Sequence, residues 1–418
     1  MKRVVTVGGG LAGCAAAITA AKAGVESIVI ERMDSLSGSG PLTGHLTHYI
    51  VRMESEALGG GAMEIDHGLK TLAFGPQMEY GRPISHIFDA TRIETKVEET
   101  VRTFGIQVML RSRVVDVVKE NGRVVGVALE DGKLVEGDAF VDATGTTGGV
   151  GVCTQWGTGC AGCFNKCTIF GDPVRVSEAA GIQDMGHAKG EYYSCIYLHP
   201  DSVDPKLLED IRQKQVVHYQ YPVPEEWQEH PLAKYWPRPE RSVRSNLGPH
   251  RSVYLMPFVK FFYQTIPLDI LRRLPGLENA WLISPLTAYG NCVKLSSYAP
   301  HDLSMRVTGL SNLFAAGLRA GNYSAFAEVM FTADLAGHNA ARTALGVTPL
   351  VTIPKTVMMG FFLAEINQGQ ALSDWPPGRF KTHDPRYFEL GLDAIEEDAI
   401  KQRVREAGLE NVFAQKLT

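Results

Sequence analysis

The first 35 residues of the chain constrain its fold more than any other stretch. A short apolar run over residues 4–7 leads into Gly8-Gly9-Gly10-Leu11-Ala12-Gly13, and residues 14–23 are Ala-rich without Gly or Pro. A second apolar run, over residues 27–30, ends at Glu31. These segments predict a strand, a tight turn, a helix and a second strand in that order, which is the opening unit of an α/β fold.

The three spaced glycines of this turn are typical of a dinucleotide-binding site. Gly8 lets the chain turn, Gly10 lets the backbone approach a pyrophosphate, and Gly13 lets the helix pack against the strand. The helix N-terminus favours the phosphate charge. Glu31 lies 18 residues after Gly13, near the spacing of an acid that binds a ribose 2′-hydroxyl. Because this acid repels a 2′-phosphate, the sequence favours NAD or FAD over NADP.

Length and composition limit the remaining possibilities. A chain of 418 residues with 44% hydrophobic and 21% charged residues can bury a large core, as one domain with an embedded second one or as two domains. No apolar run approaches the ~20 residues that cross a bilayer, and the start reads as a strand rather than a signal peptide. We therefore expect a cytoplasmic protein with no membrane contact. The net charge of −5 gives no reason to expect nucleic acid as a partner.

Residues 89–145 predict a helix followed by a small antiparallel unit. The segment 89–105 is amphipathic, with Ile93, Val97, Val101 and Phe104 on one face and Gly105 as its stop. Strands follow over residues 106–110, 114–119, 124–130 and 139–142, with a hairpin turn at Asn121-Gly122. The last strand ends in Asp142-Ala143-Thr144-Gly145. By contrast, the Gly- and Ser-rich stretch 35–61 predicts no regular element and is expected to lie over the phosphates, or to be a surface loop.

These pieces resemble the FAD-dependent oxidoreductases of the two-dinucleotide-binding-domain superfamily. The matching segments are the glycine turn with Glu31, the continuation ERMDSLSG, the strand RVVDVV with its hairpin, DATG at 142–145, and GLSNLFAAG at 309–317. The helix pattern over residues 326–345 resembles most closely the tRNA-uridine-modifying flavoproteins of the glucose-inhibited-division type. The resemblance spans roughly residues 1–150 and 280–345 and implies FAD, but no particular reaction.

The resemblance implies a set of FAD-binding residues. Gly8, Gly10 and Gly13 would take the pyrophosphate, Glu31 with the adjacent Arg32 the adenosine ribose, Val114 the adenine, Thr144 and Gly145 the ribose-pyrophosphate, and Gly317 and Gly321 the flavin. A helix starting near Ser324 would point its positive N-terminus at the flavin. A plain strand-to-helix turn also accounts for Gly317 and Gly321. No residue is assigned as the catalytic acid or base.

The predicted architecture is α/β. A Rossmann-like FAD-binding domain, built from a parallel sheet plus a small antiparallel hairpin, would be discontinuous over residues 1–150 and 281–347. An inserted α+β substrate domain would occupy residues 151–280, and residues 348–418 would form a C-terminal extension. A charged amphipathic helix expected over residues 392–407 would dock on the domain or form a contact between copies in a homo-oligomer.

Four of the seven cysteines fall within 15 residues, directly after the DATG strand. Cys153, Cys160, Cys163 and Cys167 are spaced C-x6-C-x2-C-x3-C. Because an iron-sulfur cluster needs four thiolates on short flexible loops, this spacing favours a 4Fe-4S cluster. Three other interpretations stay open, namely zinc bound by four thiolates, a redox-active Cys160–Cys163 disulfide, and inert buried thiols.

These features together predict an FAD-dependent oxidoreductase that acts on a small molecule. Electrons would pass between flavin N5 and the cysteine-bound iron-sulfur cluster or disulfide. One alternative is an electron-transfer subunit that serves a redox partner protein in a larger complex. A tRNA-modifying flavoenzyme is a further alternative, which the acidic balance of the chain disfavours.

Overall fold

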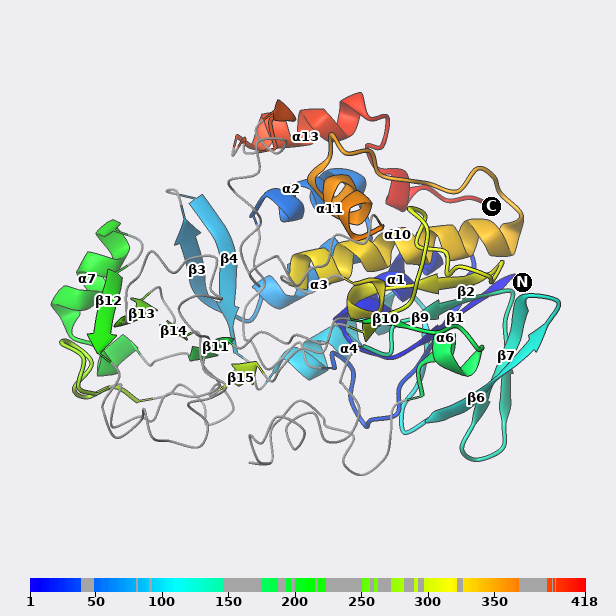
Figure 1. Ribbon diagram of the computed structural model, residues 1–418, viewed down its shortest axis with the longest axis horizontal. Helices are drawn as coiled ribbons and strands as arrows, with labels where there is room; N and C mark the ends of the chain where they lie inside the picture. The colour runs from blue at the N-terminus through cyan, green and yellow to red at the C-terminus, as the bar shows by residue number, and fades with distance from the viewer. Residues whose placement is uncertain are drawn as a thin grey trace.

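The computed structural model describes residues 1–38, 49–79, 82–89, 92–145, 174–186, 193–196, 200–214, 217–222, 250–255, 259–261, 272–281, 289–291, 297–321, 326–367, 389–392, 394 and 396–418. The fold is α/β, as predicted, and combines a parallel sheet with smaller antiparallel sheets (Figure 1). Within the described part of the chain, no helix is long and apolar enough to cross a membrane.

The parallel sheet has five strands from widely separated parts of the chain. They are β1 (Arg3–Val7), β2 (Glu26–Ile30), β5 (Gln107–Met109), β9 (Ala139–Asp142) and β17 (Leu313–Ala315), in the order β17-β9-β1-β2-β5. All four pairings are parallel. The strands are apolar along almost their whole length because elements cover both faces of the sheet. The carboxyl ends of β1, β9 and β17 consequently lie side by side.

Two helices cover the sheet and contact each other closely. They are α1 (Leu11–Lys22) and α10 (Phe326–Leu345), which run beside each other over the sheet in Figure 1. A Cβ added at Gly337 would lie 2.2 Å from the carbonyl oxygen of Ala16, so this crossing requires a glycine. The bounds of α10 agree with the helix expected over residues 326–345.

The small antiparallel unit forms as predicted, with one strand more. It contains β6 (Val114–Glu120), β7 (Arg123–Leu129) and β8 (Leu134–Glu136). Asn121 and Gly122 both have positive φ, 48° and 73°, which suits the two-residue hairpin between β6 and β7. Val127 and Val135 are buried on the inner face of the unit.

The prediction of an irregular stretch over residues 35–61 is wrong for its second half. Helix α2 (Tyr49–Leu58) occupies ten of these residues, and α3 (Gly61–Lys70) begins at its end. The segment 49–58 contains neither Gly nor Pro, and it buries Val51 and Leu58 completely. The Gly- and Ser-rich composition of the preceding residues concealed this amphipathic pattern.

The predicted helix over residues 89–105 is confirmed with a later start. Helix α4 (Ile93–Thr103) buries Ile93, Val97 and Val101 along one face, and Gly105 follows its end with a φ of 69°.

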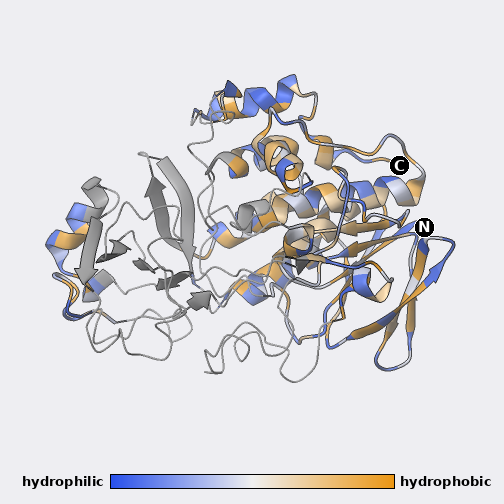
Figure 2. Cartoon of the chain, in the orientation of Figure 1, coloured by the Kyte–Doolittle hydropathy of each residue, from blue (hydrophilic) through white to orange (hydrophobic). Residues whose placement is uncertain are grey.

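The C-terminal segment packs on helices α1, α2 and α10 of the same chain. Helix α11 (Met358–Asn367) is buried on almost every side and is coloured hydrophobic in Figure 2. Glu54 on α2 accepts a hydrogen bond from the backbone N–H of Met358 at 2.9 Å, in the first turn of α11. Helix α13 (Glu397–Glu406) and the 3₁₀ turn η9 (Val412–Ala414) follow, and α13 contacts α2. The helix expected over residues 392–407 is therefore present in shorter form, docked on the same chain.

The remaining described elements are short helices and strands, and the strands pair antiparallel. They are β3 (Ala73–Glu79), β4 (Arg82–Phe88), α6 (Val176–Ala179), β10 (Met185–Gly186), β11 (Tyr193–Ile196), η3 (Pro200–Ser202), α7 (Pro205–Lys214), β12 (Val217–Pro222), β13 (His250–Leu255), β14 (Val259–Phe261), β15 (Tyr289–Asn291), β16 (Ser297–Tyr298) and η7 (Gly317–Ala320). A second five-stranded sheet has the order β12-β13-β14-β11-β15. The predicted domain boundaries stay a prediction.

Candidate functional site

The glycine-rich turn after β1 is packed too tightly for side chains. Gly8 has a φ of 103° and donates its N–H to the carbonyl oxygen of Ile30 at 2.8 Å. A Cβ at Gly8 would lie 2.3 Å from the carbonyl oxygen of Ala143, and one at Gly13 would lie 1.8 Å from that of Gly8. Both positions therefore require glycine, and the turn brings β1, α1 and β9 into direct contact.

Gly10 is different, because its missing side chain leaves space. It precedes the first residue of α1, and a Cβ there would meet only the Cα of Gly38, at 3.9 Å. The segment ending at Gly38 runs along the turn, since Ser37 donates its N–H to the carbonyl oxygen of Gly9 at 2.7 Å. Both Ser37 and Gly38 have positive φ, 80° and 56°. The sequence placed this segment in a loop near the phosphates but did not single out either residue.

Glu31 lies at the end of β2 with its carboxylate against the glycine turn. Its Oε2 accepts the N–H of Gly9 at 2.6 Å, and its Oε1 accepts the N–H of Met33 at 2.8 Å. Each carboxylate oxygen can accept more than one hydrogen bond, so both retain capacity for ribose hydroxyls. The two backbone donors fix the orientation of the carboxylate. The neighbouring Arg32 is half-buried.

Val114 begins β6, and the residues just before it pair with those just after β2. Arg111 donates its N–H to the carbonyl oxygen of Met33 at 2.8 Å, and Ser112 donates to that of Glu31 at 2.9 Å. Val114 therefore follows, by two residues, a backbone contact of Glu31.

The turn after β17 packs directly on the first turn of α1. Gly317 has a φ of 61°, and a Cβ there would lie 2.6 Å from the Cβ of Ala12. Ala316 donates its N–H to the carbonyl oxygen of Asp142 at 3.0 Å, and Ala143 donates to that of Val7 at 2.9 Å. The carboxyl ends of β1, β9 and β17 thus form one continuous edge, where α/β sheets bind their ligands.

Gly145 and Gly321 continue the two turns beyond this edge. Both have positive φ, 77° and 78°. A Cβ at Gly145 would meet nothing within 4 Å, whereas one at Gly321 would lie 3.3 Å from the ring of Tyr298. The predicted helix start near Ser324 lies outside the described residues, and α10 is described from Phe326.

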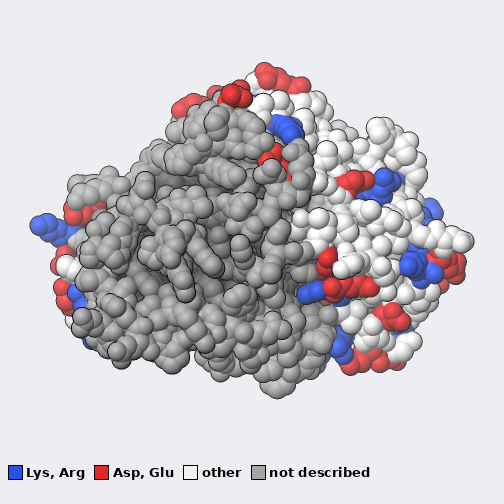
Figure 3. Space-filling model, viewed as in Figure 1, with Lys and Arg blue, Asp and Glu red and all other residues white. Residues whose placement is uncertain are grey.

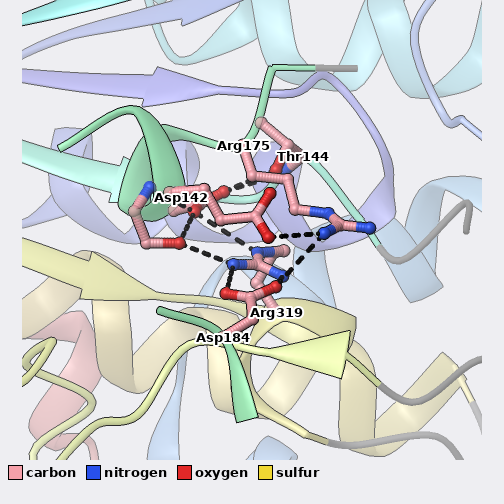
Figure 4. A network of polar contacts seen from close by, with 7 residues as sticks. Asp142, Thr144, Arg175, Asp184 and Arg319 are labelled. Carbon is pink, nitrogen blue, oxygen red and sulfur yellow. Dashed lines mark hydrogen bonds and ion pairs between the residues drawn. The ribbon is translucent and has the colours of Figure 1, made fainter. Parts of the chain in front are cut away.

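A buried polar network lies at the carboxyl ends of β9 and β17. It was not predicted from the sequence. We call it the Asp142–Arg319 network; its members are Asp142, Thr144, Arg175, Ser177, Asp184 and Arg319 (Figure 4). Asp142 Oδ1 accepts hydrogen bonds from the N–H and hydroxyl of Thr144, at 3.2 and 2.6 Å. Its Oδ2 accepts from the N–H and hydroxyl of Ser177, at 3.0 and 2.9 Å, and from Arg319 Nε at 3.3 Å.

Arg319 is fully buried and faces two carboxylates. In addition to its bond with Asp142, Arg319 donates hydrogen bonds to both carboxylate oxygens of Asp184 and to the hydroxyl of Ser177. The distance from Nη1 to Asp184 Oδ2 is 2.6 Å. Burial lowers the pKa of Arg319, but the two carboxylates outweigh that effect and raise it. Burial likewise raises the pKa of Asp142, but Arg319, Thr144 and Ser177 reverse the direction and hold this pKa below its usual value. Both groups are therefore charged.

Cys14 is described by the structure, whereas the four clustered cysteines are not. Cys14 is buried beneath the glycine turn, where its thiol donates to the carbonyl oxygen of Gly9 at 3.3 Å. Burial raises the pKa of Cys14 to about 12, so this thiol is unreactive at neutral pH. The predicted cluster of Cys153, Cys160, Cys163 and Cys167 lies outside the described residues. Among the residues that are described, no group of three or more His, Cys, Asp or Glu could hold a metal ion.

The edge formed by β1, β9 and β17 fits a dinucleotide. Gly8 and Gly13 pack the turn tightly against its neighbours, and the open space at Gly10 lies at the N-terminus of α1, where a pyrophosphate can approach the backbone. The oriented carboxylate of Glu31 lies beside it. Each of these features is one that the sequence motif predicted for dinucleotide binding.

Comparisons with known proteins point to the same chemistry. Residues 3–154 match the family model described as FAD dependent oxidoreductase. The tRNA uridine 5-carboxymethylaminomethyl modification enzyme MnmG of Alkaliphilus oremlandii is 22% identical over 441 residues, covering 87% of this chain and 65% of that protein. The menaquinone reductase of Mycolicibacterium smegmatis is 31% identical over 164 residues, covering 35% of this chain and 38% of that protein. The chain thus spans less than two thirds of these relatives.

A solved structure agrees over almost the whole chain. The form II crystal structure of Aquifex aeolicus GidA superposes with a TM-score of 0.67 at 18% identity, covering 98% of this chain and 73% of the other. At this identity the likeness establishes the fold, and the match to the FAD-dependent oxidoreductase model covers residues 3–154. The chain therefore has a GidA-like fold, and its residues 3–154 match the model of the FAD-dependent oxidoreductases.

Proposed function

We propose that FAD binds along the edge formed by the carboxyl ends of β1, β9 and β17. The observation that carries this proposal is the contact of Gly317 with Ala12, which joins the two segments that resemble flavoprotein motifs. Bound FAD supplies an acceptor for a hydride or two electrons. The residues of the chain hold and orient that group.

The residues at the edge divide this task. The N-terminus of α1 with Gly8, Gly10 and Gly13 would bind the pyrophosphate, and the segment at Ser37 and Gly38 would close over it. Glu31, oriented by Gly9 and Met33, would accept hydrogen bonds from the ribose. Thr144 and Gly145 would lie by the ribose-pyrophosphate, Val114 by the adenine, and Gly317 and Gly321 on the flavin side.

The test is direct measurement of flavin on the purified protein. Protein prepared without added cofactor, or reconstituted with FAD, is expected to carry one FAD per chain, released on denaturation and identified by chromatography. Failure to take up FAD under either condition overturns the proposal.

The proposed reaction is oxidation or reduction of a small organic molecule at the flavin. The cysteine cluster would hold an iron-sulfur cluster that exchanges electrons one at a time. The C-x6-C-x2-C-x3-C spacing is its support. Anaerobically purified protein should contain about four iron and four sulfide per chain. Iron below ~1 per chain would remove the cluster, and thiol titration would then separate a Cys160–Cys163 disulfide from zinc.

A second candidate function is modification of tRNA uridine. The observation that favours it is the similarity to MnmG, which extends over 87% of this chain. The net charge of −5 disfavours it, and on the face drawn in Figure 3 the described basic and acidic side chains are interspersed. Salt-sensitive retention of tRNA by the purified protein would favour this second function.

A third candidate function is that of an electron-transfer subunit. The compound or protein that reduces the bound FAD distinguishes it from an enzyme with its own substrate. An enzyme with its own substrate predicts that an organic compound reduces the bound FAD in an anaerobic titration. A subunit of a redox complex predicts that only a partner protein does so, and that this partner copurifies with the chain.

A further inference from the structure

The Asp142–Arg319 network lies between the two turns that the proposed FAD site uses. Asp142 is the last residue of β9, and Arg319 lies in η7, directly after Gly317 and Leu318. The backbone of Asp142 also joins these turns, because its carbonyl oxygen accepts the N–H of Ala316. The next residue, Ala143, contacts Gly8. The backbone N of Thr144, a member of the network, lies there as well, so the network adjoins the glycine turn.

We propose that Arg319 is a positioning residue of the flavin site, which fixes the turn after β17 on the turn after β9 and neutralises the two carboxylates behind them. This inference rests on the proposed binding of FAD at the same edge. Arg319 itself is fully buried and contacts other side chains of the network, so it acts through them.

Arg319 is the main cationic partner of the two buried carboxylates. It faces Asp142 and Asp184, whereas Arg175 Nη1 lies 2.8 Å from the exposed Glu178 Oε1 and 3.4 Å from Asp184 Oδ2. Without Arg319, the buried Asp142 would keep only the neutral donors of Thr144 and Ser177, and Asp184 would keep the more distant Arg175. A net negative charge would then lie behind the edge that is proposed to bind phosphates. Because buried charges are poorly screened, this charge would oppose FAD binding.

The geometry requires arginine rather than any cation. Nε faces Asp142, while Nη1 and Nη2 together face both oxygens of Asp184, and Nη2 also reaches Ser177. A planar fork of five donors can satisfy these three groups at once. A lysine ammonium at the same depth can neutralise one carboxylate but cannot bridge the two.

The network also fixes the first described residues beyond the DATG turn. Ser177 binds Asp142 through both its N–H and its hydroxyl, and Asp184 binds Arg319. The described residues on either side of the range 146–173 are thus held on one buried carboxylate, by Thr144 before it and Ser177 after it. Loss of Arg319 would loosen this junction as well as the turn after β17.

Asn312 offers a matched control. It is fully buried directly before β17, at the opposite end of that strand, where its side chain bonds the backbone of Val124 and Asp138. Asn312→Ala breaks three hydrogen bonds near the same strand, two of them buried, without changing a charge or touching the carboxyl edge. It reports how far general destabilisation alone affects FAD binding.

The experiment compares the full-length wild type, Arg319→Met, Arg319→Lys, Asn312→Ala and the double variant Arg319→Met/Asp184→Asn. Dissociation constants for FAD are measured at a temperature where all apo forms are folded, together with their melting temperatures. We expect Arg319→Met to weaken FAD binding by about tenfold or more, Arg319→Lys by less, and Asn312→Ala by under about twofold despite a lower melting temperature. The double variant should bind FAD more tightly than Arg319→Met, because it removes one of the two carboxylates that Arg319 neutralises in the wild type.

The outcomes separate this inference from the proposed function. A wild type that takes up no FAD overturns the proposed function. A wild type that binds FAD overturns the present inference if Arg319→Met binds equally well, or if Asn312→Ala loses the same affinity. Failure of the double variant to improve on Arg319→Met removes the charge part of the inference. If Arg319→Met yields no folded protein, Arg319→Lys and Asn312→Ala are judged by the same criteria.

Discussion

A Cβ at Gly317 would lie 2.6 Å from the Cβ of Ala12, so the turn after β17 and the first turn of α1 meet without space for one methyl group. The two residues are 305 positions apart in the chain. This contact joins two segments that are far apart in the sequence, at the edge where we propose that FAD binds.

Gly317→Ala should therefore destabilise the protein and weaken FAD binding. The new methyl group would strain a backbone with a φ of 61° and would also collide with Ala12, for a total of about 2–4 kcal/mol in the free energy of unfolding. Urea denaturation measures this loss. The control is Gly346→Ala, where φ is 73° but a Cβ would meet nothing within 4 Å. Equal losses in the two variants would show that the contact with Ala12 contributes nothing.

Gly13→Ala and Gly10→Ala should have opposite consequences. A Cβ at Gly13 would lie 1.8 Å from the carbonyl oxygen of Gly8, so this variant should lose about 3 kcal/mol or more of stability. A Cβ at Gly10 would meet only Gly38 at 3.9 Å, so this variant should unfold at nearly the wild-type urea concentration. It should nevertheless bind FAD more weakly, because the methyl group would occupy the space proposed for the pyrophosphate. Wild-type FAD affinity in Gly10→Ala would contradict that placement.

Asp334 should make the protein less stable as the pH rises toward 7. Its carboxyl group lies at the N-terminus of α3, where it accepts hydrogen bonds from the Thr19 hydroxyl at 2.7 Å and the Ala62 N–H at 3.0 Å. Burial raises the pKa of Asp334 to about 7 in the folded protein, despite these donors. Because the folded pKa exceeds the unfolded one, the stabilisation is complete below about pH 4 and is lost as the pH rises through 7.

Asp334→Asn tests this directly. The amide keeps an acceptor for Thr19 and Ala62 but cannot ionise, so the variant should lose less stability than the wild type between pH 4 and 8, by on the order of 1–3 kcal/mol. Part of the dependence should remain, since burial also raises the pKa of Glu54 to about 7. Urea denaturation at several pH values gives the comparison. An unchanged slope would contradict the assignment to Asp334.

His338 should act in the opposite direction. It is fully buried on α10 with its ring centroid 5.5 Å from that of Phe413, and neither ring nitrogen has a hydrogen-bond partner among the described residues. Burial lowers the pKa of His338 to about 4. Because the folded pKa is depressed, the stability is complete above about pH 6.5 and is lost as the pH falls toward 4.

His338→Leu should then stabilise the protein, by on the order of 1 kcal/mol at pH 7, because it removes two buried polar atoms without partners. The gain should grow as the pH is lowered. Melting temperatures at pH 7 and pH 5 measure both effects. A destabilised variant at both pH values would indicate that the imidazole contributes through its shape or through a bound water molecule.

The sequence correctly predicted the elements whose structure depends only on residues close together in the chain. The glycine turn, the Asn121-Gly122 hairpin and the helix over residues 326–345 are each specified by residues within one short segment. Helix α2 was missed because the Gly- and Ser-rich residues before it hid where the amphipathic pattern begins. The FAD-binding residues stay predictions, although the structure brings most of them to one edge.

The Asp142–Arg319 network could not be read from the sequence. Its two central residues are 177 positions apart, and nothing in the local sequence of either marks it as half of a buried pair. Charged residues are common near turns, and most of them are solvated. The close pairing between β9 and β17 is what removes these two from water, and that pairing is a property of the assembled sheet.

The salt bridge behind the flavin edge should also limit how this position can change over evolution. Asp142 is fully buried, and Arg319 is its cationic partner, so exchanging Arg319 alone leaves an isolated carboxylate inside the protein. Related sequences that carry a neutral residue at position 319 should therefore carry a neutral residue at position 142 as well. An alignment of many related sequences would show this as covariation between the two positions.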